Sequence, residues 1–385
     1  MKKKACFVVL MILLALQFPS CFKLDRSVSQ PEGMLLVVPT MVVLLTNTET
    51  NMATQEDIFQ LHKQIAAWKE FFVREVGQYI ELELHFVQID DYVGLEDITK
   101  MGNGGYHLLA RDASTLLRRA GINPRGFSLV VAFWAWRPRS GVYKAYGGAA
   151  EGPPSYSLDG AGYHSQAVFD GPYEYISRVS IHESLHNLDG MFDLVGIERF
   201  WHADQMAALM PELLAEKPGA FLPYRTDSEM LELAEKEKKG QYSFSWEEQL
   251  VFYRHMLARM EPWEWEALEL GYRRDYRDVK RMSENVYVEP LYKTMSLPAG
   301  VPAYVPVLVR NSNGSAVDNA RVYLAEQRLN YETYIHTGQS SVVFENAYYG
   351  GWTDPELEGT VRIAVENVFG SDGQALSSTV VLRRR

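Results

Sequence analysis

Cysteine is almost absent from this sequence. Of its 385 residues only Cys6 and Cys21 are cysteines, and Cys6 lies in an N-terminal apolar stretch that we expect to be removed. The processed chain would then keep a single thiol, which excludes an intrachain disulfide. The composition is otherwise that of a folded protein, and the chain is long enough for two domains.

Clustered positive charge is also missing. Lysine and arginine number 38 against 49 acidic residues, which gives a formal net charge of −11. The one basic cluster beyond the N-terminal lysines is the tail Arg383–Arg385, which we interpret as a solvated end. A nucleic-acid partner would need grouped cations to neutralise phosphates, so the sequence predicts no nucleic-acid binding.

Apolar runs long enough to cross a membrane do not occur. The longest run, Ala5 to Leu16, is too short for a comfortable span and follows the basic residues Lys2 to Lys4. This arrangement predicts an export signal over residues 1–21. Its end, "FPSC", resembles a bacterial lipoprotein signal and places Cys21 where the lipidated first residue of the mature protein stands. We therefore expect an exported protein, anchored in the bacterial cell envelope through Cys21, or secreted if Cys21 carries no lipid.

After a polar linker over 22–33, residues 34–286 form the first expected domain. Apolar runs at 34–45, 80–89 and 127–136 indicate strands, and helical spacing at 55–77 and 112–121 indicates helices between them. Strands alternating with helices predict an α/β layer. Further helices are expected at about 203–215, 229–239 and 246–270, the last with a capping box formed by Ser245 and Glu248.

From residue 287 onward the residue pattern changes to short β-rich runs separated by turn residues. Examples are "AYVPVLVRN", "GTVRIAVEN" and "STVVLRR", with "SNGSAVDN" and "GSDGQ" between such runs. Five or more strands in this length predict a small all-β sandwich over 287–385. In this pattern the segment resembles bacterial Ig-like modules.

The stretch "SIHESLHNLDGMFD", Ser180 to Asp193, carries the chemistry. Its His-Glu-x-x-His spacing places His182 and His186 on one face of a helix, where both rings can reach one metal ion. The sequence supports a helix because a parallel apolar stripe runs beside them, at Ile181, Leu185, Leu188 and Phe192. Glu183 follows His182 and lies one residue further round the helix, where it can take a proton from a metal-bound water.

With its Gly190 and Asp193, the pattern His-Glu-x-x-His-x-x-x-Gly-x-x-Asp is similar to that of the IgA-peptidase family of zinc metallopeptidases. The resemblance covers about twelve residues, and Leu194 and Val195 depart from the acid and aromatic of that family. It implies an α+β zincin-like catalytic domain, built from a mixed sheet, an active-site helix and a helical C-terminal subdomain. It further implies one Zn²⁺ bound by His182, His186 and Asp193, with Glu183 as general base, and Gly190 ending or bending the helix before Asp193.

Other third ligands are open. Asp189 lies on the right face but too far along a straight helix to join both histidines, so its expected role is a hydrogen bond to a ligand histidine or to the turn. Glu198, His202 and Asp204 could return from the next segment, and His202 could instead stabilise an oxyanion. His164, just upstream, could lie on the cleft wall near the metal, but the more common role, and the one we expect, is that of a surface residue beside a strand.

The expected activity is peptide-bond hydrolysis of proteins or peptides, extracellular glycoproteins included, with the β-module as a spacer or substrate-binding support. Two alternatives are open. One is a surface-anchored binding protein of the cell envelope that holds a glycan or a host protein. The other is a zinc-dependent amidase or deacylase, which would use the same site.

Overall fold

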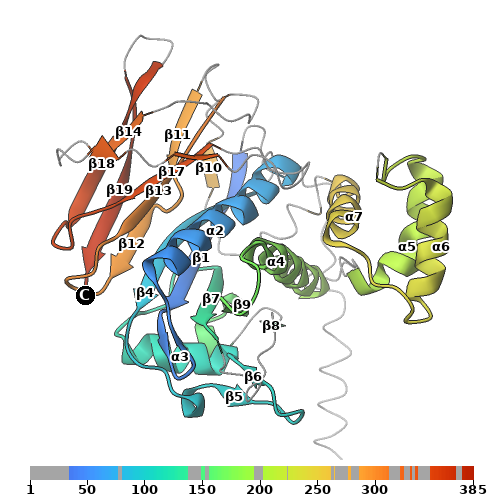
Figure 1. Ribbon diagram of the computed structural model, residues 1–385, viewed down its shortest axis with the longest axis horizontal. Coiled ribbons are helices and arrows are strands. Elements are labelled where there is room, and N and C mark those ends of the chain that lie inside the picture. The colour runs from blue at the N-terminus through green and yellow to red at the C-terminus, as the bar shows by residue number, and fades with distance from the viewer. Residues whose placement is uncertain are drawn as a thin grey trace, which may run out of the picture.

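A computed structural model (Figure 1) gives the arrangement of the chain. It describes residues 34–76, 80–137, 149–151, 156–194, 203–222, 224–261, 264, 276–278, 286–311, 321–324, 330–331, 334–336, 347–369 and 375–385. The expected signal over 1–21 with Cys21, and the linker over 22–33, lie outside these residues. In the described part of the chain, no helix combines the length and apolarity needed to cross a membrane.

Four parallel strands form the centre of the first part. They lie in the order β4 (Ile80–Ile89), β1 (Met34–Leu45), β7 (Leu129–Ala135) and β9 (Gly162–Val168). The short strand β8 (Ala149–Glu151) pairs with β9 in the antiparallel sense, and β10 (Tyr276–Asp278) pairs in the same sense with the start of β1. The near-continuous apolar runs of β1 and β7 are typical of strands buried on both faces.

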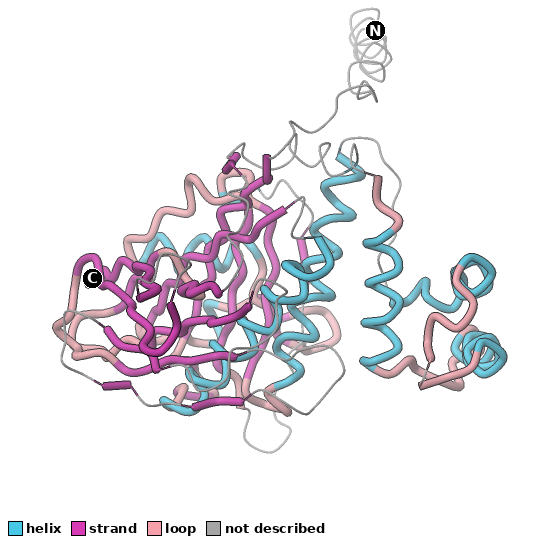
Figure 2. The backbone as a smooth tube through the Cα atoms, turned by 90° about the horizontal axis from the view of Figure 1, so that it is seen from above, coloured by secondary structure: helices cyan, strands magenta, loops and turns pink. Residues whose placement is uncertain are grey.

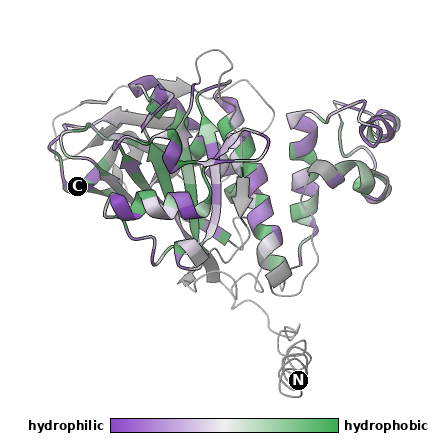
Figure 3. Cartoon of the chain, turned by 90° about the horizontal axis from the view of Figure 1, so that it is seen from below, coloured by the Kyte–Doolittle hydropathy of each residue, from purple (hydrophilic) through white to green (hydrophobic). Residues whose placement is uncertain are grey.

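Helices cover both faces of this sheet. Helix α2 (Gln55–Val76) and helix α4 (Glu174–Leu194) lie on one face, and α3 (Ala110–Arg119) lies on the other (Figures 1 and 2). The side chains of β1 alternate between them: Val42 and Leu44 belong to the cluster under α2 and α4, whereas Met41 and Val43 belong to the cluster under α3. Apolar residues fill the strands, and hydrophilic residues lie along the outer sides of the helices (Figure 3).

Small elements complete this part. They are the strands β2 (Asn47–Thr48), β3 (Asn51–Met52), β5 (Thr99–Lys100) and β6 (Tyr106–His107), and the 3₁₀ turns η1 (Leu95–Asp97) and η3 (Tyr156–Leu158).

Three helices follow the motif, as expected: α5 (Ala203–Glu216), α6 (Asp227–Glu237) and α7 (Trp246–Ala258). The capping box of α7 is confirmed, because Glu248 N donates to Ser245 Oγ and Ser245 N donates to Glu248 Oε2 at 2.7 Å. The expectation that this helix continues to 270 is wrong, since it ends at Ala258. Pro262 explains the early end, because the residue before a proline avoids the helical conformation.

The C-terminal segment is rich in strands, as predicted. Its described strands are β11 (Val286–Pro290), β12 (Thr294–Leu297), β13 (Tyr304–Asn311), β14 (Arg321–Leu324), β15 (Asn330–Tyr331), β16 (Tyr334–His336), β17 (Ala347–Trp352), β18 (Gly359–Phe369) and β19 (Ala375–Arg384). Four of them form a separate sheet in the order β11-β13-β17-β16, while β15, β14, β18, β19 and β12 extend the first sheet.

This extension means that the two expected domains share one mixed sheet. Strand β12 lies between β4 and β19 and is parallel to both, with Thr294 opposite His85. Polar contacts strengthen the join: His85 bonds Glu83 through Nε2 and Thr294 through Nδ1, and Lys293 Nζ donates to both carboxylate oxygens of Glu83 at 2.9 Å. Among the described strands, the first sheet therefore contains members from both sides of the expected boundary at 286/287.

A buried histidine lies where α2 meets the C-terminal segment. The His62 ring is 1% exposed, its Nδ1 lies 2.7 Å from Tyr292 Oη, and it stacks on Tyr304. Burial lowers the pKa of His62 to about 3. The folded chain therefore holds this imidazole neutral at pH values where an unfolded chain would protonate it.

His62 should make the protein acid-sensitive. Between pH 6.5 and 3 the unfolded chain binds a proton at His62 that the folded chain does not, so the free energy of unfolding falls as the pH is lowered. From pH 6.5 to 5.0 the contribution of this one group is about 1.5 kcal/mol. Urea unfolding at both pH values should show a pH-dependent loss smaller by that amount in His62→Gln than in the wild type. Equal losses would contradict the assignment.

Candidate metal centre

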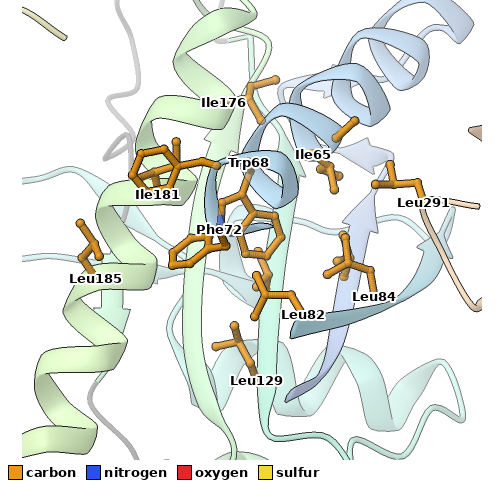
Figure 4. Close-up of a cluster of buried hydrophobic side chains, with 14 of the residues drawn as sticks. Ile65, Trp68, Phe72, Leu82, Leu84, Leu129, Ile176, Ile181, Leu185 and Leu291 are labelled. Atoms are coloured by element: carbon orange, nitrogen blue, oxygen red, sulfur yellow. The ribbon is translucent and has the colours of Figure 1, made fainter. Parts of the chain in front are cut away.

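The predicted helix around the motif is confirmed as α4, and its buried stripe is as expected. Ile181, Leu185, Leu188 and Phe192 are between 0% and 4% exposed. Ile181 and Leu185 belong to the same buried cluster as Trp68 and Phe72 of α2 (Figure 4). The apolar stripe therefore fixes the rotation of α4 against its neighbours.

Polar contacts hold the same helix on two further sides. Trp68 Nε1 of α2 donates to Ser184 Oγ at 3.0 Å, and that hydroxyl donates in turn to the carbonyl of Ser180 at 2.7 Å. On the sheet side, Asn187 Nδ2 lies 3.3 Å from His164 Nδ1 of β9 and donates to the carbonyl of Glu183 at 3.0 Å. A Cβ at Gly162 would lie 2.9 Å from Asn187 Oδ1, so the glycine permits this close approach.

His164 is buried, which corrects the expectation of a surface residue. It is 0% exposed, with the indole of Trp68 edge-on at 5.9 Å. Burial, followed by the charge of His186, lowers the pKa of His164 to about 3. A neutral His164 accepts from Asn187 at Nδ1, so it supports the underside of α4 as an uncharged packing residue.

The two histidines of the motif converge. His186 Nε2 lies 2.9 Å from His182 Nε2, and the ring centroids are 4.6 Å apart with an interplanar angle of 80°. Two imidazole lone pairs repel at this distance unless a proton or a cation lies between them. With zinc–nitrogen bonds of about 2.0–2.1 Å at tetrahedral angles, two ligand nitrogens lie about 3.3 Å apart, close to the observed spacing. The pair therefore fits a shared metal ion.

Tyr253 orients the first of these rings. Its Oη, contributed by α7, lies 2.8 Å from His182 Nδ1, and its side chain is 0% exposed. If Nδ1 donates its proton to this hydroxyl, the lone pair of Nε2 faces His186 and is available to a metal. Sequence reasoning missed this residue, because the helical pattern of α7 marks Tyr253 only as a core position.

Glu183 is buried beside the histidines. Its residue is 6% exposed, and burial raises the pKa of the Glu183 carboxyl to about 7. A carboxyl with such a pKa can exchange a proton near neutral pH. A divalent cation bound next to it would favour the carboxylate form.

The third ligand is not placed by the described residues. Within them, no group of three histidine, cysteine or acidic side chains lies close enough to hold a metal ion. Asp189 is buried at 8% exposure on the helix, one turn beyond His186. Glu198 and His202 lie outside the described residues, and the side chains of Asp193 and Asp204 do as well.

Of the two roles expected for Gly190, ending the helix is wrong, because α4 continues to Leu194, and bending it stays a prediction. Leu185, Leu188 and Phe192 bury the stripe on either side of the glycine, which outweighs its low helix propensity. The helix rises about 1.5 Å per residue, so the backbone of Asp193 lies roughly 10 Å beyond His186 along the axis. The continuous helix gives no support to a ligand at Asp193, which stays a prediction.

Comparison with known proteins assigns no family to this chain. No family model matches it, and no curated protein matches it. Among solved structures it is similar to one described as the BIgI domain of beta protein from S. agalactiae bound to CEACAM1. That similarity has 9% sequence identity and a TM-score of 0.17, and covers 26% of this chain and 94% of that chain. A likeness at this TM-score supports no statement about the fold or function of this chain.

Replacing Tyr253 should lower the affinity for zinc, with a smaller effect on the stability of the folded chain. Tyr253→Phe removes the hydroxyl that orients His182, and the loss of such a partner typically lowers metal affinity about 10–100-fold. Zinc titration against a chromophoric chelator measures the effect. Tyr242→Phe is the matched control, since the Tyr242 hydroxyl donates to Glu248 and not to a histidine. Equal zinc affinities in the two variants would contradict a role for Tyr253.

Proposed function

We propose that this chain is an exported, zinc-dependent peptidase with a zincin-like catalytic domain, anchored in the bacterial envelope through Cys21. The observation that carries the proposal is the convergence of His182 Nε2 and His186 Nε2 at 2.9 Å, within a stretch of α4, Ser180 to Asp189, whose other residues are buried. The export signal and Cys21 support the location, and the β-rich C-terminal segment serves as an Ig-like support for substrate.

The described residues fit a zinc ion in part. His182 and His186 would hold it, and Asp193, Glu198, His202 and Asp204 are the predicted sources of a third ligand. When bound, zinc lowers the pKa of a bound water to about 7. Glu183, one residue from the first ligand, would accept the proton of the attacking water and then donate it to the leaving amine. The hydroxyl joins the carbonyl carbon, and the peptide C–N bond breaks.

A peptide is the substrate that the edge of the sheet favours. Among the described strands β8 ends the sheet order, it pairs with β9 on one side only, and it contacts α4. An edge strand offers unpaired backbone groups to an extended chain, which can add as a further strand. This edge next to α4 supports peptide hydrolysis over hydrolysis of a small amide or acyl group.

Metal analysis tests the site. The purified chain should bind one zinc, and His186→Ala should lose it because one of the two converging nitrogens is gone. Asp193→Asn, Glu198→Gln, His202→Gln and Asp204→Asn, measured by the same titration, identify the third ligand as the residue whose loss of zinc approaches that of His186→Ala. We expect the smallest loss for Asp193→Asn, given the continuous helix. A wild-type chain that binds no zinc after supplementation would refute the proposal.

Glu183→Gln should separate metal binding from catalysis. The amide keeps the shape of the side chain but cannot take up a proton, and loss of a general base typically lowers the rate 10²–10⁴-fold. We expect unchanged zinc content and hydrolysis of a fluorogenic peptide mixture reduced by roughly this factor. Full activity in this variant would exclude Glu183 as the base.

A further inference from the structure

Around the motif the exposed side of α4 is a single stripe, whereas nearer the start of the helix Glu174, Tyr175 and Val179 are also exposed or partly exposed. Between Ser180 and Asp189 every residue is buried except His182 and His186, which are partly exposed. Continued towards the start of the helix at the same four-residue spacing, the stripe reaches Arg178, which is also partly exposed. The surface that presents the two histidines therefore presents one guanidinium as well.

Two aromatic rings fix the position of this guanidinium. Arg178 Cζ lies over the ring of Tyr175 at 5.3 Å and over the ring of Trp246 at 5.3 Å. Contacts between a cation and aromatic faces hold the flat group in place without neutralising its charge, so the N–H groups at its edge keep their capacity to donate. The arginine is pre-organised rather than freely rotating.

No carboxylate in the described part of the chain forms an ion pair with Arg178. Other arginines of the same protein do find acids: Arg137 pairs with Asp57, Arg225 with Glu248 and Arg254 with Glu75. The acids next to the two rings in sequence, Glu174 and Glu247, make no such pair with Arg178. In a chain with a net charge of −11, an arginine held in place without an acid is suited to an acid from outside.

The same face of α7 supports the arginine and the first histidine. Trp246 and Tyr253 lie seven residues apart, two turns of helix, and contact Arg178 and His182 respectively. Along α4, Arg178 and His182 are separated by a rise of about 6 Å. The residues of α7 that contact them are about 10 Å apart along that helix, so an extended peptide covers the distance between the two groups in about two to three residues.

We propose that Arg178 binds a carboxylate of the substrate, so that the enzyme selects peptides with an acidic group about two to three residues from the cleaved bond. The acidic group is an Asp or Glu side chain or the C-terminal carboxylate of the peptide. This inference rests on the proposed peptidase function and adds the substrate class to it.

The test uses short fluorogenic peptides on the zinc-loaded full chain. Each position in turn carries Glu or Gln, and each peptide is made with a free C-terminal carboxylate and as an amide. We expect a Glu:Gln or acid:amide ratio in kcat/KM of about tenfold at one position, carried mainly by KM. A Glu:Gln preference identifies the side chain, and an acid:amide preference identifies the C-terminus.

Arg178→Gln should bring that ratio to about one while zinc content stays at the wild-type level, and Arg178→Lys should restore part of it. Arg125→Gln is the control for net charge, because Arg125 is exposed and pairs with Asp159 on the surface; it should keep the wild-type ratio. Hydrolysis without any acidic preference, or a preference that survives in Arg178→Gln, would overturn this inference and leave the peptidase intact. A chain that binds no zinc and cleaves no peptide would overturn both.

Discussion

The rotation of α4 about its own axis is the constraint on which the candidate site depends. Successive helical residues are about 100° apart, so a rotation of α4 by that angle about its axis would bury the histidines and expose Glu183 or Ile181. Three contacts prevent this rotation: the apolar stripe on α2, the bond from Trp68 to Ser184, and the approach of Asn187 to His164 over Gly162. They leave His182 and His186 as the partly exposed residues of the motif, with Glu183 buried beside them.

The second organising feature is α7, which reaches α4 with long side chains. Tyr253 and Trp246 contact two different residues of α4, one polar contact at His182 and one cation–π contact at Arg178. The capping box at Ser245 fixes where α7 begins, and so sets which residues face α4. A local sequence signal thus contributes to a site that lies far from it along the chain.

The C-terminal strands are joined to the first part of the protein through a shared sheet. Strand β12 covers the edge of β4, which would otherwise present unpaired backbone groups. Lys69 pairs with Glu289, and Arg385 donates to the carbonyl of Gln88, so further contacts tie the segment to the first part. The Ig-like pattern of the sequence does not reveal this, because strand patterns state which residues alternate and not which strands become neighbours.

The sequence by itself determined the local structure: the strands of the α/β layer, the helix around the motif, its buried stripe and the cap of α7. These follow from periodicity and capping, which act over a few residues. Only the tertiary structure decided that α4 continues through Gly190 and that His164 is buried. It also decided that Tyr253 and Arg178 lie next to the two histidines, and that the first sheet includes strands from beyond residue 286. Each of these depends on contacts between segments distant in sequence, whose burial outweighs local propensity. For the same reason the motif indicated two nitrogens of a metal centre, but could not indicate what surrounds them.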